Sequence, residues 1–153
     1  MGKLSKPVLI AVIAGAVLVA VGVGVLATLV GAAIYGYPKV VIAGNEAAAL
    51  ANVEAIRIAQ IRYYTEHRTY CTFDQLIEQD FLSRRFAGDT PIVDGYVYNL
   101  RVAPARAGEA STFALNADPK SADMGRRHFF IDDSSGTIHV NSHQPASAND
   151  PPK

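Results

Sequence analysis

The longest apolar segment of the chain runs from Val8 to Ile34 and contains no charged residue. A helix rises about 1.5 Å per residue, so about 20 apolar residues can cross the hydrocarbon core of a bilayer. The segment exceeds that length, and it exceeds the apolar region of about 7–15 residues in a secretory signal peptide. It predicts one transmembrane helix over residues 8–37. Small residues near Gly31 leave a cleaved signal peptide as the alternative.

The charges that flank this segment predict its orientation. Lys3 and Lys6 precede the segment, whereas Lys39 alone follows it closely. Under the positive-inside rule, residues 1–7 lie in the cytoplasm and the remainder of the chain lies across the membrane. The expected location is the inner membrane of a bacterium, as a single-pass protein with a periplasmic domain.

Small side chains recur every four residues along the predicted span. They are Ala16, Ala20, Gly24, Thr28, Ala32 and Gly36. Such a stripe lets a second helix approach closely in lipid, so it predicts contacts with other transmembrane subunits as well as with the bilayer. The alternative is that Gly and Ala are simply frequent in membrane helices.

The helical pattern is interrupted after the span and then resumes. Pro38 and Gly44 predict a kink or linker over residues 38–44, and Asn45 is a suitable cap for a new helix that continues to about His67. One face of this helix carries apolar residues and is expected to pack on the rest of the domain, with two isoleucines widening the apolar stripe: Leu50, Val53, Ile56, Tyr63, Ile58 and Ile61. Four polar residues must point outward or pair: Asn52, Arg57, Arg62 and Glu66.

The remainder of the domain reads as a short helix followed by strands. Residues 72–82 predict a helix capped by Thr72 or Asp74, and residues 87–95 are rich in turn-forming residues. Alternation of apolar and polar residues then predicts four strands, near residues 96–102, 112–117, 128–131 and 137–140. The last two are joined by a hairpin turn at 132–136, in which Gly136 can adopt a positive φ. Residues 142–153 contain no large apolar side chain and are expected to be disordered.

These segments resemble the type IV pilins and the pseudopilins of type II secretion. Residues 46–76 are similar to the exposed half of the long first helix of those proteins, with an EAxA opening and Ala-Gln followed by Tyr. The sequences DGYVYNLRV (94–102), FALNADP (113–119) and GRRHFFIDDSSGTIHVN (125–141) resemble their closing strands. The resemblance implies an α+β fold over residues 45–141, in which an amphipathic helix packs on a three- or four-stranded antiparallel sheet.

The amino terminus departs from that family. Pilin precursors carry a basic leader, a glycine and an apolar segment with a glutamate at its fifth position. Here Gly2 is followed by KLSKPVLIA, and the first glutamate of the chain is Glu46. The resemblance therefore implies that the pilin-like domain is retained, while the signal for processing and polymerisation is absent.

The composition argues against several classes of function. Fourteen basic and fourteen acidic residues give no net charge, which argues against a nucleic-acid-binding protein. The single cysteine, Cys71, excludes an intramolecular disulfide. The sequence contains no phosphate-binding glycine loop and no dinucleotide fingerprint, so no cofactor and no small-molecule substrate are expected.

A few residues are candidates for chemical roles. His67 and Cys71 have a spacing that suits one helical face, but no third group is evident that would orient a nucleophile, and an idle thiol is the simpler interpretation. His139 and His143 are spaced like half of a zinc site. Asp132, Asp133 and Ser134 can supply oxygen ligands to calcium, although their turn-forming role explains them without an ion. The arginine pairs 84–85 and 126–127 suit solvated loops or partner docking.

The sequence thus predicts a non-enzymatic, single-pass membrane protein that serves as an accessory or structural subunit of a larger membrane complex. The alternative is a subunit of a type IV pilus or a type II secretion pseudopilus with an aberrant leader.

Overall fold

The computed structural model describes residues 39–106 and 108–153. The predicted membrane span over residues 8–37, with its small-residue face, lies outside the described residues. Among those that are described, no helix has both the length and the apolar character needed to cross a bilayer. The fold class and the inner-membrane, periplasmic location expected from the sequence are corrected accordingly: the described structure shows a helix on a sheet, without a membrane-spanning helix.

One long helix occupies residues 39–67. Residues 39–44 are helical, so the linker expected over residues 38–44 is wrong for this stretch. Gly44 is accommodated because one glycine costs a helix only about 1 kcal/mol relative to alanine. Asn45 does not cap a helix, and its side-chain amide instead donates to the carbonyl oxygen of Met124 at 2.9 Å. A tertiary contact replaces the local role that the sequence suggested.

Five antiparallel strands form one sheet in the order β1-β2-β3-β4-β5. They are β1 (Ile92–Val93), β2 (Tyr96–Ala103), β3 (Thr112–Pro119), β4 (His128–Asp132) and β5 (His139–Asn141). The predicted strands correspond to β2–β5, whereas the expected number of three or four is wrong because β1 was not foreseen. A strand of two residues is too short to produce a recognisable alternation.

The second helix, α2, spans Phe73–Glu78 and is shorter than the predicted range 72–82. Thr72 caps its amino terminus in a capping box with Gln75, as its sequence position suggested. The helix ends early because Asp80 adopts a left-handed conformation with φ of 55°. A 3₁₀ turn, η1 (Arg84–Phe86), then leads toward β1.

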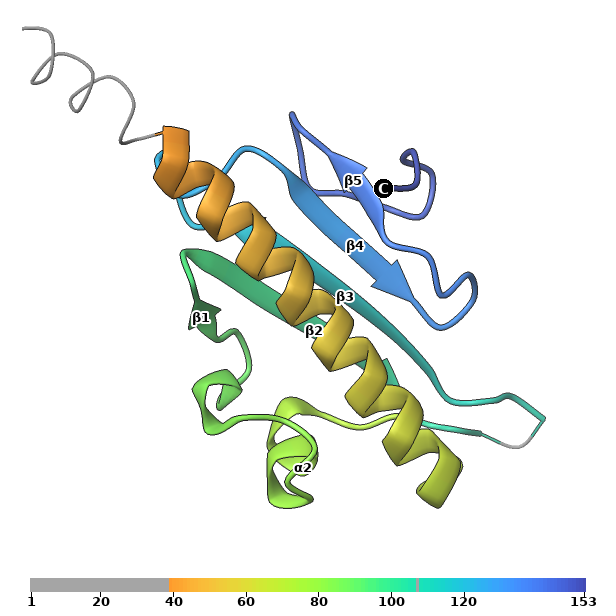
Figure 1. Ribbon diagram of the computed structural model, residues 1–153. Coiled ribbons are helices and arrows are strands. Elements are labelled where there is room, and N and C mark those ends of the chain that lie inside the picture. The colour runs from red at the N-terminus through yellow and green to blue at the C-terminus, as the bar shows by residue number, and fades with distance from the viewer. Residues whose placement is uncertain (1–38, 107) are drawn as a thin grey trace, which may run out of the picture. The chain divides into compact units, whose positions relative to one another are not determined.

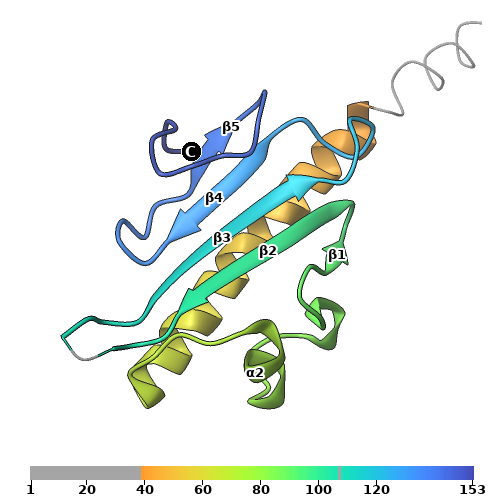
Figure 2. The same cartoon turned by 180° about the vertical axis from the view of Figure 1, so that it is seen from behind.

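The long helix lies along one face of the sheet, and Figures 1 and 2 show that face and the opposite one. The side chains that fill the space between them are buried: Ala49, Val53, Ile56, Tyr96, Tyr98, Phe113, Leu115, Ala117, Phe129 and Ile131. Alternation along β4 directs Phe129 and Ile131 toward the helix and Phe130 toward the other face. The predicted packing face of the helix is confirmed at Val53 and Ile56, whereas Leu50 is only partly buried.

The predicted disordered tail, residues 142–153, is instead paired with the sheet. The amide of Val140 donates to the carbonyl oxygen of Pro151 at 3.0 Å, and the amide of Lys153 donates to the carbonyl oxygen of Ile138 at 2.9 Å. An isolated bridge links His139 and Pro152. The prediction of disorder is wrong because backbone and polar contacts position the tail, although it has no large apolar side chain.

Candidate interaction surface

The long helix exposes a second apolar face, opposite the one that packs on the sheet. At 100° per residue, six exposed apolar positions between residues 43 and 61 fall on one side of the helix: Ala43, Ala47, Ala51, Ala55, Ile58 and Ile61. We call these six residues the outer helix face. Ile58 is 54% exposed and Ile61 is 45% exposed. The prediction that these isoleucines widen the packing face is therefore wrong, since they point away from the sheet.

Charged residues at this surface are paired along the helix. Arg57 Nε donates to Glu54 at 2.9 Å, and Arg62 Nε lies 3.8 Å from the Glu66 carboxylate. The predicted need of these polar residues to point outward or pair is confirmed. Because the Glu54 carboxylate is engaged by Arg57, it adds no unpaired charge to the outer helix face.

A buried amide on the inner side of the helix fixes the chain that follows. Gln60 is fully buried, and its side chain both donates to the carbonyl oxygen of Cys71, at 2.6 Å, and accepts from the amide of Cys71, at 3.2 Å. This pair of bonds replaces strand pairing for an otherwise buried backbone segment. No local pattern predicts this backbone partner, because Cys71 lies eleven residues further along the chain.

A second buried amide ties the middle of the helix to the first hairpin. Asn52 is 4% exposed and donates to Asp94, at 3.0 Å, and to the Tyr98 hydroxyl, also at 3.0 Å. Its own oxygen accepts from the Arg85 guanidinium, and Arg85 also donates to Asp94 at 3.2 Å. Every buried side-chain polar atom in the described part of the chain has such a partner. The helix is thus held at a fixed angle on the sheet.

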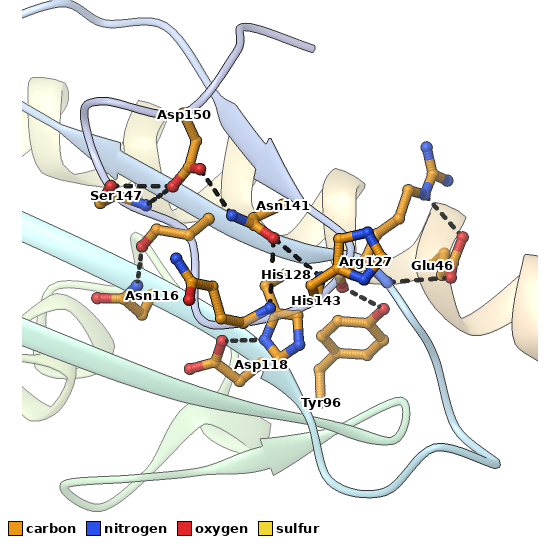
Figure 3. A network of polar contacts seen from close by, with 12 residues as sticks. Glu46, Tyr96, Asn116, Asp118, Arg127, His128, Asn141, His143, Ser147 and Asp150 are labelled. Atoms are coloured by element: carbon orange, nitrogen blue, oxygen red, sulfur yellow. Dashed lines mark hydrogen bonds and ion pairs between the residues drawn. The ribbon is translucent and has the colours of Figure 1, made fainter.

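A carboxylate near the start of the described helix makes the third tie. Glu46 accepts from the Arg126 amide at 2.9 Å and from Arg127 Nε at 2.7 Å (Figure 3). The buried Tyr96 hydroxyl donates to the carbonyl oxygen of Arg127 at 2.8 Å. Gly125 lies against the Tyr96 ring, where a Cβ atom would be only 2.2 Å from the phenolic oxygen. The loop before β4 is therefore locked to the helix.

No family model, curated protein or solved structure matches this chain. The pilin-like identity therefore stays a prediction that rests on the motifs quoted above.

The cysteine–histidine pair suggested by the sequence is not assembled. Cys71 is buried at 2% exposure, and burial raises the pKa of its thiol to about 12. His67 is exposed and its ring lies tilted against that of Tyr63, with centroids 4.2 Å apart. A thiol that is neutral at physiological pH and buried beneath the helix is a poor nucleophile.

We expect Cys71 to resist alkylation in the folded protein. At pH 8, the raised pKa depletes the thiolate, so iodoacetamide should modify native Cys71 at least about a hundredfold more slowly than the unfolded chain. Mass spectrometry over a time course measures the rate. An exposed control, Ala87→Cys, should react rapidly at its new thiol. Equal rates at the two positions would contradict the burial described here.

The candidate metal ligands have other partners. His139 Nδ1 donates to the carbonyl oxygen of Asp150 at 2.6 Å, whereas the His143 side chain is exposed. Asp132 accepts bonds from Ser134 and Ser135 inside the hairpin turn, and Asp133 accepts from the amide of Phe113. Within residues 39–106 and 108–153, no group of three or more His, Cys, Asp or Glu side chains is positioned to hold an ion.

The arginine pairs are not simply solvated. One member of each pair, Arg85 and Arg127, bonds to a carboxylate that braces the helix against the sheet. The second members, Arg84 and Arg126, have exposed side chains. The sequence does not reveal these structural roles, because Glu46 is distant in sequence from Arg127 and Asp94 belongs to the turn between β1 and β2.

Proposed function

We propose that this chain is a non-enzymatic subunit of a larger protein assembly, in which the outer helix face contacts an apolar helix of a neighbouring subunit. The observation that carries the proposal is the exposure of Ile58 and Ile61 on a helix whose opposite side is already buried. A surface helix normally exposes polar residues on the side that faces water, whereas this side carries alanines and two isoleucines. The outer helix face therefore has the character of a surface that a partner covers.

The shape of this surface supports close helix packing. Alanines recur every four residues at positions 43, 47, 51 and 55, so small side chains leave the backbone accessible along about three turns. The larger side chains of Ile58 and Ile61 follow at one end and can enter a groove of the partner. The ties made by Glu46, Asn52 and Gln60 support the proposal as well, because they present this surface on a rigid element and reduce the entropy lost on association.

We expect Ile58→Arg to release the chain from its assembly. An arginine at this position would place an unpaired charge in an apolar contact, which costs several kcal/mol when the charge cannot reach water. Native electrophoresis of the full-length protein from its source would measure the size of the complex. The matched control is Ile92→Arg on β1, since Ile92 is also 54% exposed.

The two variants separate an interface from general surface effects. Both should fold with melting temperatures close to that of the parent chain, because neither side chain belongs to the buried core. Release of the Ile58→Arg chain alone would support the proposal. If both variants remain in the complex, or if both leave it, the outer helix face is not the contact surface.

The second candidate is a pilus or pseudopilus subunit. The feature that favours it is the element order, a long helix followed by an antiparallel meander, which is the arrangement that the resemblance implied. Fold-level likeness is a weak guide to function. Negative-stain electron microscopy of cells that overproduce the chain tests this candidate, and filaments that can be labelled through an added tag would favour it over the accessory subunit.

A further inference from the structure

The face of the sheet opposite the helix contains one large buried apolar side chain. Asn116 on β3, Phe130 on β4 and His139 on β5 are register partners, so they form one row across three strands. Phe130 is only 7% exposed, although it does not belong to the core beneath the helix. Another part of the chain must therefore cover it.

The tail crosses this row and is bonded on both sides of Phe130. Asn116 Nδ2 donates to the carbonyl oxygen of Ala146 at 2.8 Å, and His139 Nδ1 donates to that of Asp150 at 2.6 Å. Ala146 is 4% exposed. The segment from residue 146 to residue 150 thus spans the row from β3 to β5, and Ala146 is the one buried side chain that the tail supplies.

The side chain of Asp150 secures the tail in this position. It accepts from Asn141 Nδ2 at 2.7 Å, from the Ser147 amide at 2.7 Å and from the Ser147 hydroxyl at 2.9 Å (Figure 3). Residues 151–153 then pair with β5 and cover the outer edge of that strand. An uncovered edge is a template for another strand.

The position occupied by the tail has the properties of a peptide-binding site. It offers an apolar contact at Phe130, side-chain donors at Asn116 and His139, and a strand edge for backbone pairing, as in peptide recognition by strand addition. The tail buries one alanine and is otherwise exposed or half-buried, so it can detach without opening the core.

We propose that this site, formed by Asn116, Phe130, His139 and the β5 edge, can bind the tail of a second copy of the chain in place of its own. Every contact available to the resident tail is available to an identical tail from a neighbour. Such an exchange links two copies through the same contacts that the tail makes within one copy, which is a low-cost route to association. The proposal involves the sheet face away from the helix and is independent of the outer helix face.

Disulfide trapping in the full-length chain tests this exchange. His139 and Pro152 form a non-hydrogen-bonded antiparallel pair, in which Cα atoms are about 4.5 Å apart, within the range that a disulfide spans. A chain carrying His139→Cys is mixed with a chain carrying Pro152→Cys, and diamide is added as the oxidant. A covalent dimer should form in about tenfold higher yield than in a control mixture of the His139→Cys and Ala148→Cys chains, because the effective concentration of the thiols is high only when the tail is bound.

Two further measurements decide the outcome. The double variant His139→Cys, Pro152→Cys should close a disulfide within one chain, and failure to close it overturns the tail position and the proposal. An excess of free peptide with the sequence of residues 142–153 should reduce the dimer yield of the mixture by competing for the site. A yield no higher than the control, with closure intact in the double variant, shows that only the chain's own tail binds there and overturns the exchange.

Discussion

Replacement of Ile56 by alanine should lower the free energy of unfolding by about 2–5 kcal/mol, the range observed when a large aliphatic side chain is removed from a core. Ile56 is fully buried and lies within the cluster that joins the helix to the sheet. The loss has two components: the transfer free energy of the deleted methyl groups and the cavity that remains where the sheet cannot collapse onto the helix. Urea denaturation followed by circular dichroism measures the change.

Ile58→Ala is the matched control, since it makes the same chemical change two residues further along the same helix. Its side chain is 54% exposed, so we expect a change within about 0.5 kcal/mol. A comparable loss in the two variants would show that the helix is rotated about its axis relative to the packing described here.

The periodic parts of the fold could be predicted from sequence. Along β2 and β3 the apolar residues alternate with polar ones, and the burial pattern follows this alternation, with Tyr98 and Leu115 buried and Asn99 exposed. Thr72 likewise acts as the predicted cap, because capping depends on residues only three positions apart. Local signals of this kind identify an element and the direction of its side chains.

Features that depend on distant partners could not be predicted in the same way. Asn45 suits a helix start, yet a carbonyl oxygen 79 residues away determines its role. The apolar pattern places Ile58 and Ile61 on the packing face, yet they are exposed, because a sheet covers only one side of a helix. The tail lacked any apolar signal, since its position depends on bonds to β5 and to Asn116. The candidate surfaces for assembly fall among these unpredicted features.

Glu46→Gln should lower the free energy of unfolding by about 1.5–3 kcal/mol near neutral pH, as expected for hydrogen bonds that involve a charged group. Burial alone would raise the pKa of the Glu46 carboxyl group. Hydrogen bonds from the Arg126 amide and the Arg127 side chain, together with the charge of Arg127, outweigh burial and hold that pKa below its usual 4.5. The carboxylate form is therefore favoured more strongly in the folded chain than in the unfolded one.

The sign of the pH dependence follows from this lowered pKa. The stabilisation by ionised Glu46 is fully present above the unfolded-state pKa and is lost as the pH falls through the lower, folded-state value. The difference in unfolding free energy between the parent chain and Glu46→Gln should thus be constant from pH 7 to about pH 5 and shrink in more acidic solution.

Glu54→Gln is the control, because the half-exposed Glu54 pairs with Arg57 within one turn of the helix and contributes at most about 0.5 kcal/mol. Urea denaturation measures this difference in unfolding free energy. If it stays the same down to pH 2 for Glu46→Gln, the charge of Glu46 has no stabilising role.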